Sequence, residues 1–98
     1  GLIFDIPQGY SVRLHIRSSL AAKCGITLAN AEGVIDSDYV DQVYILVQNN
    51  TSLAVVIKHG ERICQGELVP QLKYELFNSP VAPEVKGNRV GGFGSTGK

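Results

Sequence analysis

Hydrophobic and polar positions alternate along much of this chain. The alternation is clearest in four stretches rich in β-branched residues, namely 2–6 (LIFDI), 11–17 (SVRLHIR), 42–49 (QVYILVQN) and 53–60 (LAVVIKHG). Successive side chains of an extended chain point to opposite faces, so a period of two predicts β-strands in these stretches. Residues 73–77 (KYELF) continue the pattern and predict a last strand.

Turn signals separate these stretches. They are PQG at 7–9, NNTS at 49–52 and the His59-Gly60 pair. Only residues 18–24 (SSLAAKC) have the composition of a short helix. Short strands with regular turn punctuation are typical of an all-β sandwich or barrel, and we expect one of the jelly-roll type.

The composition changes near residue 79. From there on Pro, Gly, Val and Asn predominate, which predicts a β domain over 1–78 and a flexible C-terminal arm over 79–98. A sequence of 98 residues has room for one domain with a modest core, so a large cleft needs a second chain. We therefore expect an oligomer.

Charge and apolar content limit the classes of partner. The formal net charge is zero, so no basic field would attract nucleic acid or an anionic membrane, and we expect neither partner. No apolar run approaches the roughly 18 residues that span a bilayer, and the sequence does not start with a signal-peptide profile. The expected location is therefore the cytoplasm, with the nucleus or a host cell also compatible.

The metal-ligating residue types are sparse. Cys24 and Cys64 form no CxxC pair, and we expect both to be reduced and buried rather than joined in a disulfide. His15 lies in a predicted strand and His59 in a predicted turn, where structural roles are expected instead of metal binding.

The stretch GGFGSTGK (91–98) resembles a phosphate-binding P-loop. That motif needs a buried strand before it, and Pro80 and Pro83 interrupt the preceding segment, so the P-loop interpretation fails. A glycine-rich tail remains, with Phe93 as its aromatic residue. Taken alone, it is typical of a frayed terminus.

Two further stretches could carry chemistry. RSSLAAKCGI (17–26) places two serines at a helix start, where free amides and hydroxyls suit a phosphate; a plain serine N-cap is an equally good interpretation. NAEGVIDSDYVDQV (30–43) holds Asp36 and Asp38, which share a face if the segment is extended. One of these carboxylates could act as a general base on water, although an ordinary polar turn also explains the stretch.

Four motifs in this order resemble those of the trimeric dUTPases, which hydrolyse dUTP to dUMP and pyrophosphate. RSSLAAKCGI is similar to that family's phosphate motif, NAEGVIDSDY (30–39) to its uracil and catalytic motif, GERICQ (60–65) to the next motif and GGFGSTG (91–97) to its closing motif. The resemblance implies a distorted jelly roll of the β-clip type. It also implies a homotrimer in which each active site is shared between subunits.

The resemblance assigns roles to individual residues. Asp36 is implied as the general base that activates the attacking water, and Tyr39 as the ring against the deoxyribose that rejects UTP. The remaining implied contacts are Asn30, Gly33, Tyr44 and Phe93 for uracil and deoxyribose; Ser18, Ser19, Gln65, Arg89, Ser95 and Thr96 for phosphate; and Arg17 and Asp38 for support of the subunit interface. Mg²⁺ is the implied cofactor, held by the substrate phosphates with no direct protein ligand, while the tail closes as a lid.

The sequence also departs from the family pattern. It matches from the middle of the family domain onward, without the first motif whose aspartate binds the waters around the metal. Arg89 stands four residues before Phe93, one fewer than usual, and Gly66 with Glu67 interrupts a strand that is usually apolar, so the packing there is expected to differ.

Two other functions compete with dUTP hydrolysis. A dCTP deaminase, from the same fold superfamily, would need a catalytic Glu in the strand 42–49, which has none. A dUTPase-like module that binds nucleotide or a protein partner without turnover is favoured by the missing first motif and the shifted Arg89. The retained Asp36 argues against it, because a binding module has no need of a carboxylate at the α-phosphate.

Overall fold

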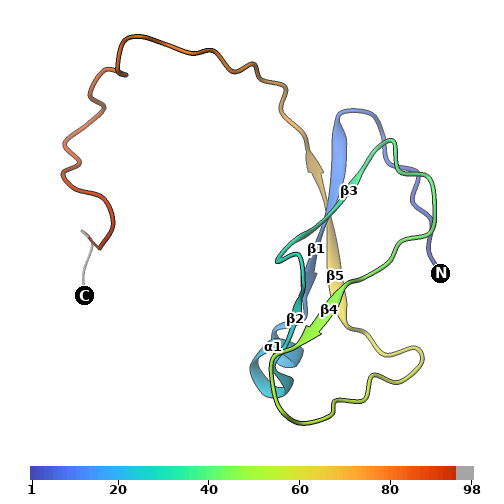
Figure 1. Ribbon diagram of the computed structural model, residues 1–98. Coiled ribbons are helices and arrows are strands. Elements are labelled where there is room, and N and C mark those ends of the chain that lie inside the picture. Colours follow the sequence, from blue (N-terminus) through green and yellow to red (C-terminus); the bar gives the residue numbers. More distant parts are fainter. Residues whose placement is uncertain (95–98) are drawn as a thin grey trace.

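The computed structural model describes residues 1–94, and most of its regular structure is β-strand (Figure 1). In chain order the elements are β1 (Tyr10–Ile16), α1 (Ser18–Cys24), β2 (Ile26–Leu28), β3 (Gly33–Asp36), β4 (Val47–Asn49) and β5 (Cys64–Pro70). A three-stranded sheet has the order β3-β1-β5, and a two-stranded sheet pairs β2 with β4. The all-β prediction is confirmed, although the sheets are not closed into a barrel.

The strand β1 is the centre of the larger sheet. It runs antiparallel to β3 from Ser11↔Asp36 to Leu14↔Gly33, and antiparallel to β5 from Tyr10↔Pro70 to Ile16↔Cys64. The alternation of 11–17 explains this position, because one face of β1 is apolar and the other is polar. Each residue of β1 therefore fixes which residues of β3 and β5 stand beside it.

A small apolar core lies on one face of this sheet. Its buried members are Ile6, Val12, Leu14, Leu28 and Ile35, with Phe4, Ile16, Val43, Ile45 and Cys64 packed against them. Val12, Leu14 and Ile16 of β1 point into this core, as a period of two requires, whereas Tyr10 at the start of the strand is exposed. Cys24 and Cys64 are free thiols, as predicted, but both are only partly buried, so the prediction of full burial is wrong. Partial burial raises the pKa of the Cys64 thiol and favours its neutral form.

The helix α1 occupies the predicted residues 18–24. It ends at Gly25, whose φ of 65° is left-handed and whose amide donates to the carbonyl of Leu20, a conformation that glycine adopts readily. Arg17 is the N-cap, and no side chain caps the helix. The serine N-cap interpretation is therefore wrong, and the hydroxyls of Ser18 and Ser19 remain exposed.

Several predicted strands are extended segments without a strand partner. Residues 2–6, 53–60 and 73–77 form no ladder, and of 42–49 only β4 is paired. Phe4 and Ile6 pack in the core, but burial of side chains does not supply a neighbouring backbone. A strand also needs hydrogen-bond partners, and alternation is silent about them.

The strand β5 forms a complete ladder although its sequence does not alternate. Gly66 and Glu67 break the alternation there, yet all seven residues pair with β1. A Cβ atom at Gly66 would stand 3.3 Å from Cγ1 of Val12 and 3.4 Å from Cδ2 of Leu14, so the glycine allows close approach to the core face. The sequence predicted different packing at Gly66 and Glu67, and the structure shows it as a close approach of β5 to β1.

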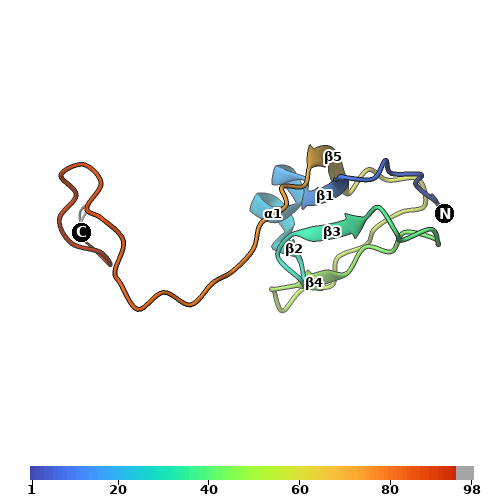
Figure 2. The same cartoon turned by 90° about the horizontal axis from the view of Figure 1, so that it is seen from above.

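Beyond β5 the chain extends away from both sheets, as two views at right angles show (Figures 1 and 2). Large apolar side chains in this segment are exposed, among them Leu72, Tyr74, Leu76 and Phe77. Their exposure leaves an apolar surface without a partner in the chain. Within residues 1–94 no helix is long and apolar enough to cross a membrane.

Candidate functional site

A cavity of about 240 Å³ lies beside the end of β3. Its walls come from the strand end and from the irregular segment that follows, and they are Val34, Ile35, Asp36, Tyr39, Val43, Tyr44 and Leu46. Mostly apolar and aromatic walls with one carboxylate are typical of a site for a flat organic group next to a polar one.

A tight turn brings Asp36 and Tyr39 together. The amide of Tyr39 donates to the carbonyl of Asp36 at 3.1 Å, so the chain reverses directly after β3. The polar turn weighed for this stretch is therefore present, and it forms one wall of the cavity. The extended geometry stops at Asp36, so Asp36 and Asp38 are not neighbours on one face of a strand.

Two tyrosine side chains are anchored at one residue. The hydroxyl of Tyr39 donates to the carbonyl oxygen of Gln42 at 2.5 Å, and that of Tyr44 donates to Oε1 of Gln42 at 3.5 Å. These bonds orient the two rings that line the cavity. Sequence analysis missed Gln42; its period-two relation to Tyr44 and Leu46 was the available signal.

The Asp36 carboxylate is exposed at the edge of this cavity. In the part of the chain that the structure describes, it has no hydrogen-bond or ion-pair partner. A carboxylate free of such partners can accept a proton from a nearby water.

The turn at residues 30–33 leads into β3, which begins at Gly33. Ala31 adopts a positive φ of 65°, its amide donates to the carbonyl of Leu28 at 3.0 Å, and the amide of Glu32 donates to the carbonyl of Asn30 at 2.7 Å. Asn30 is exposed, whereas Gly33 is buried against Leu14. The two residues implied for uracil binding are therefore at the two ends of one tight turn.

We expect Gly33→Ala to destabilise the fold by about 1 to 2 kcal/mol. An added Cβ would stand 3.1 Å from Cβ and 3.2 Å from Cδ1 of Leu14, closer than side chains normally pack. Urea unfolding followed by circular dichroism measures the change. Gly92→Ala is the matched control, because an added Cβ at Gly92 would have nothing within 4 Å. Gly87 is unsuitable as a control, since its φ of 72° would itself strain an alanine. Equal losses at Gly33 and Gly92 would contradict the packing argument.

The residues implied for phosphate contact lie at the other end of β1. The amide of Arg17 donates to the carbonyl of Ile63 at 3.0 Å, and its guanidinium donates to the carbonyl of Arg62 at 3.2 Å, which ties the start of α1 to the chain entering β5. Ser18 and Ser19 follow directly, and Gln65 pairs with His15 across the sheet. The motifs at 17–26 and 60–65 thus meet at one sheet end.

One chain does not bring all the candidate residues together. Asp36 stands opposite Ser11 and Gln65 opposite His15, and four strand residues span roughly 13 Å. Arg89 and Phe93 are exposed, and the segment after β5 that carries them extends away from both sheets (Figure 1). Ser95 and Thr96 lie outside the described residues.

Metal-binding residues do not cluster in the described chain. Among residues 1–94 no three His, Cys, Asp or Glu side chains are placed to hold an ion together.

Comparison with known proteins identifies the family. The family model for dUTPase matches residues 1–97. Relatives named deoxyuridine 5'-triphosphate nucleotidohydrolase include those of Hydrogenobaculum sp. (38% identical, covering 99% of this chain and 67% of the relative) and Nautilia profundicola (42% identical, 100% and 68%). A third, from Roseobacter denitrificans, is 46% identical over 99% of this chain and 63% of its own length.

The sequence spans about two thirds of the length of these curated relatives. The similarity covers β1, α1, the cavity and the extended segment alike, because the matched region is nearly the whole sequence. None of the relatives named above is a deaminase or a non-catalytic module, so neither alternative gains support. The chain belongs to the dUTPase family.

Proposed function

We propose that this protein hydrolyses dUTP to dUMP and pyrophosphate, which keeps uracil out of DNA and supplies dUMP for dTTP synthesis. Family membership supports the substrate. The observation that carries the proposal is the cavity in which the unpartnered carboxylate of Asp36 lies beside the anchored ring of Tyr39. It combines a base for water with a surface for a nucleoside.

In the proposed reaction Asp36 removes a proton from a water molecule. The water oxygen attacks the α-phosphorus and forms a new P–O bond, while the bond from the α-phosphorus to the bridging oxygen breaks and pyrophosphate leaves with that oxygen. Asp36 then releases the proton to solvent. A positioned base of this kind contributes about a hundred-fold to ten-thousand-fold in rate.

The nucleoside would lie against the cavity walls. The ring of Tyr39 would pack on the deoxyribose and leave no room for a 2′-hydroxyl, with Tyr44 beside it. The turn from Asn30 to Gly33 would bind uracil through polar groups of Asn30 and the backbone, as a base pair does. The tight hydrogen bonding of that turn supports this role, because base recognition needs fixed donors and acceptors.

The phosphates would be bound by residues of other subunits in a homotrimer. Ser18, Ser19 and Gln65 lie roughly four strand residues along β1 from the level of Asp36, about 13 Å. That separation supports a site assembled from several chains, and the exposed apolar side chains beyond β5 support oligomerisation. Arg17 and Asp38 would stabilise the interface rather than contact the nucleotide.

The arm would complete the site. Phe93 is fully exposed in the part of the chain that the structure describes, so it is available to cover uracil when nucleotide binds. Arg89, with Ser95 and Thr96, would contact the β- and γ-phosphates. A closing segment of this kind excludes water from the reacting phosphate only when substrate is bound. We retain the prediction that residues 1–78 form the β domain and 79–98 the arm.

Magnesium would enter as part of the substrate. The chain offers no cluster of ligands in its described part, which fits a Mg²⁺ ion chelated by the triphosphate oxygens of dUTP. Such an ion offsets the negative charge that develops on the leaving pyrophosphate. The chain's own residues then orient the chelate and supply the base.

Pyrophosphate release tests this proposal. dUTP, dCTP, dTTP and UTP are compared at equal concentration, with magnesium and with a chelator. We expect turnover of dUTP alone, dependent on magnesium. Binding of dUTP without turnover would instead indicate a non-catalytic relative.

A further inference from the structure

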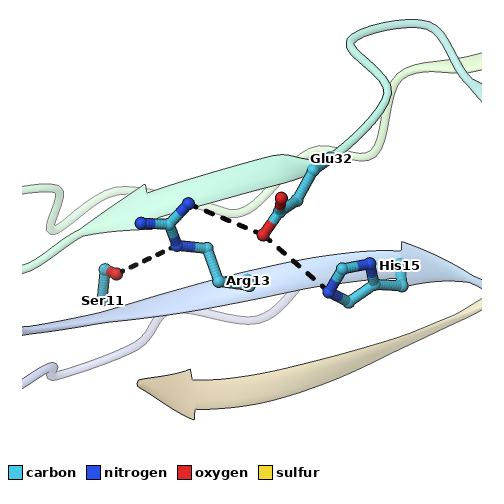
Figure 3. Close-up of polar contacts among 4 residues, drawn as sticks. All are labelled: Ser11, Arg13, His15 and Glu32. Carbon is cyan, nitrogen blue, oxygen red and sulfur yellow. Dashed lines mark hydrogen bonds and ion pairs between the residues drawn. The ribbon is translucent and has the colours of Figure 1, made fainter. Parts of the chain in front are cut away.

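Four polar side chains form a network where β3 begins (Figure 3). Oε1 of Glu32 lies 3.6 Å from Nη1 of Arg13 and 3.8 Å from Nε2 of His15. Nε of Arg13 also donates to Oγ of Ser11 at 3.4 Å, and Ser11 is fully buried. Glu32 comes from the Asn30–Gly33 turn, whereas the other three residues come from β1.

The strand register explains why these residues meet. Ser11, Arg13 and His15 share the face of β1 opposite the core. The ladder between β1 and β3 ends at Leu14↔Gly33, and one further step places Glu32 across from His15. The backbone ladder between β1 and β3 stops at Gly33. The side chain of Glu32 makes the next contact with β1.

The hydrogen bonds inside the turn fix its shape but do not attach it to β1. The hydrogen bonds of the Ala31 and Glu32 amides stay within the segment 28–32, and Ala31 adopts an unfavourable positive φ. Among residues 1–94 the side chains of the turn make no hydrogen bond or ion pair other than those of Glu32. Packing of Gly33 on Leu14 and the carboxylate of Glu32 therefore fix the turn from the two opposite faces of the sheet.

We propose that Glu32 is a positioning residue for base recognition: its contacts with Arg13 and His15 hold the Asn30–Gly33 turn on β1. This inference rests on the proposed function, in which that turn binds uracil. Loosening the turn should weaken binding of the base without altering Asp36, which lies at the other end of β3. Glu32 would thus act on KM and on discrimination between bases rather than on kcat.

The test compares Glu32→Gln with wild type in the full-length protein. Because partly exposed ion pairs contribute modestly, we expect KM for dUTP to rise about three-fold with kcat within about two-fold, and preference over dCTP to fall. Glu67→Gln is the matched control. Glu67 stands across from Arg13 on β5, yet it makes no ion pair within residues 1–94. An equal effect of Glu67→Gln would overturn the inference.

Two double variants test the network itself. Arg13→Gln combined with Glu32→Gln should raise KM no more than the larger single effect, since both remove one contact. His15→Gln combined with Glu32→Gln should behave in the same way, because the second contact of Glu32 is with His15. Additive effects in both pairs would overturn the inference.

Amide hydrogen exchange separates this inference from the proposed function. The amides of Ala31 and Glu32 should exchange about three-fold faster in Glu32→Gln than in wild type, whatever the activity. If wild type fails to turn over dUTP but exchange accelerates, the proposed function fails and the contact with β1 remains. If wild type is active and neither KM nor exchange changes in the variant, the role of Glu32 alone is wrong.

Discussion

Asp36→Asn is expected to lower kcat for dUTP by about a hundred-fold to ten-thousand-fold while leaving affinity for a non-hydrolysable dUTP analogue nearly unchanged. Asparagine keeps the size and most of the polarity of the side chain but cannot accept the proton of water. Because the Asp36 carboxylate has no polar partner among residues 1–94, its replacement breaks no structural contact. Single-turnover hydrolysis and calorimetric titration measure the two quantities separately.

Asp41→Asn is the matched control for this prediction. Asp41 is exposed, follows the same turn and is not a wall of the cavity. The control removes the same charge near the site, and we expect kcat within about two-fold of wild type. Equal losses of binding and turnover in Asp36→Asn would assign Asp36 to substrate binding, and a matching loss in Asp41→Asn would assign the effect to general charge.

Sequence patterns predicted the parts of the fold that depend on local chemistry. The alternation in 11–17 located β1 to within one residue, and the composition of 18–24 gave α1. Pairing was harder to predict, because β5 carries Gly66 and its strand character comes from contact with Val12 and Leu14 in β1. Residues 53–60 show the opposite error, since they alternate but have no backbone partner.

In the candidate site, too, contacts between residues close in sequence were easier to predict than contacts between strands. The sequence named Asp36 and Tyr39, and the turn between them brings both to one cavity. It did not reveal Gln42, whose role depends on the direction of two tyrosine hydroxyls. Contacts that lie close in sequence were predictable from residue types. The ion pairs of Glu32 with β1 required the register of two strands, which no local pattern supplies.

Tyr39→Ala is expected to relax discrimination against UTP by about ten-fold to a hundred-fold. The ring of Tyr39 forms a wall of the cavity, and its hydroxyl is anchored to the carbonyl of Gln42. An anchored ring cannot move aside for a 2′-hydroxyl, whereas the space left by alanine accepts it. The ratio of kcat/KM for dUTP and UTP measures the effect, and we expect it to fall mainly because UTP improves.

Tyr39→Phe separates the ring from its anchor. Phenylalanine keeps the aromatic wall but loses the hydrogen bond to Gln42, so the ring regains some freedom, and we expect discrimination to fall only about two-fold to five-fold. If Tyr39→Phe lost as much selectivity as Tyr39→Ala, orientation by Gln42 would be the source of discrimination rather than the bulk of the ring. Unchanged selectivity in Tyr39→Ala would contradict the sugar contact itself. The graded result, with alanine far worse than phenylalanine, is expected because steric exclusion needs the ring, and the anchor only limits its motion.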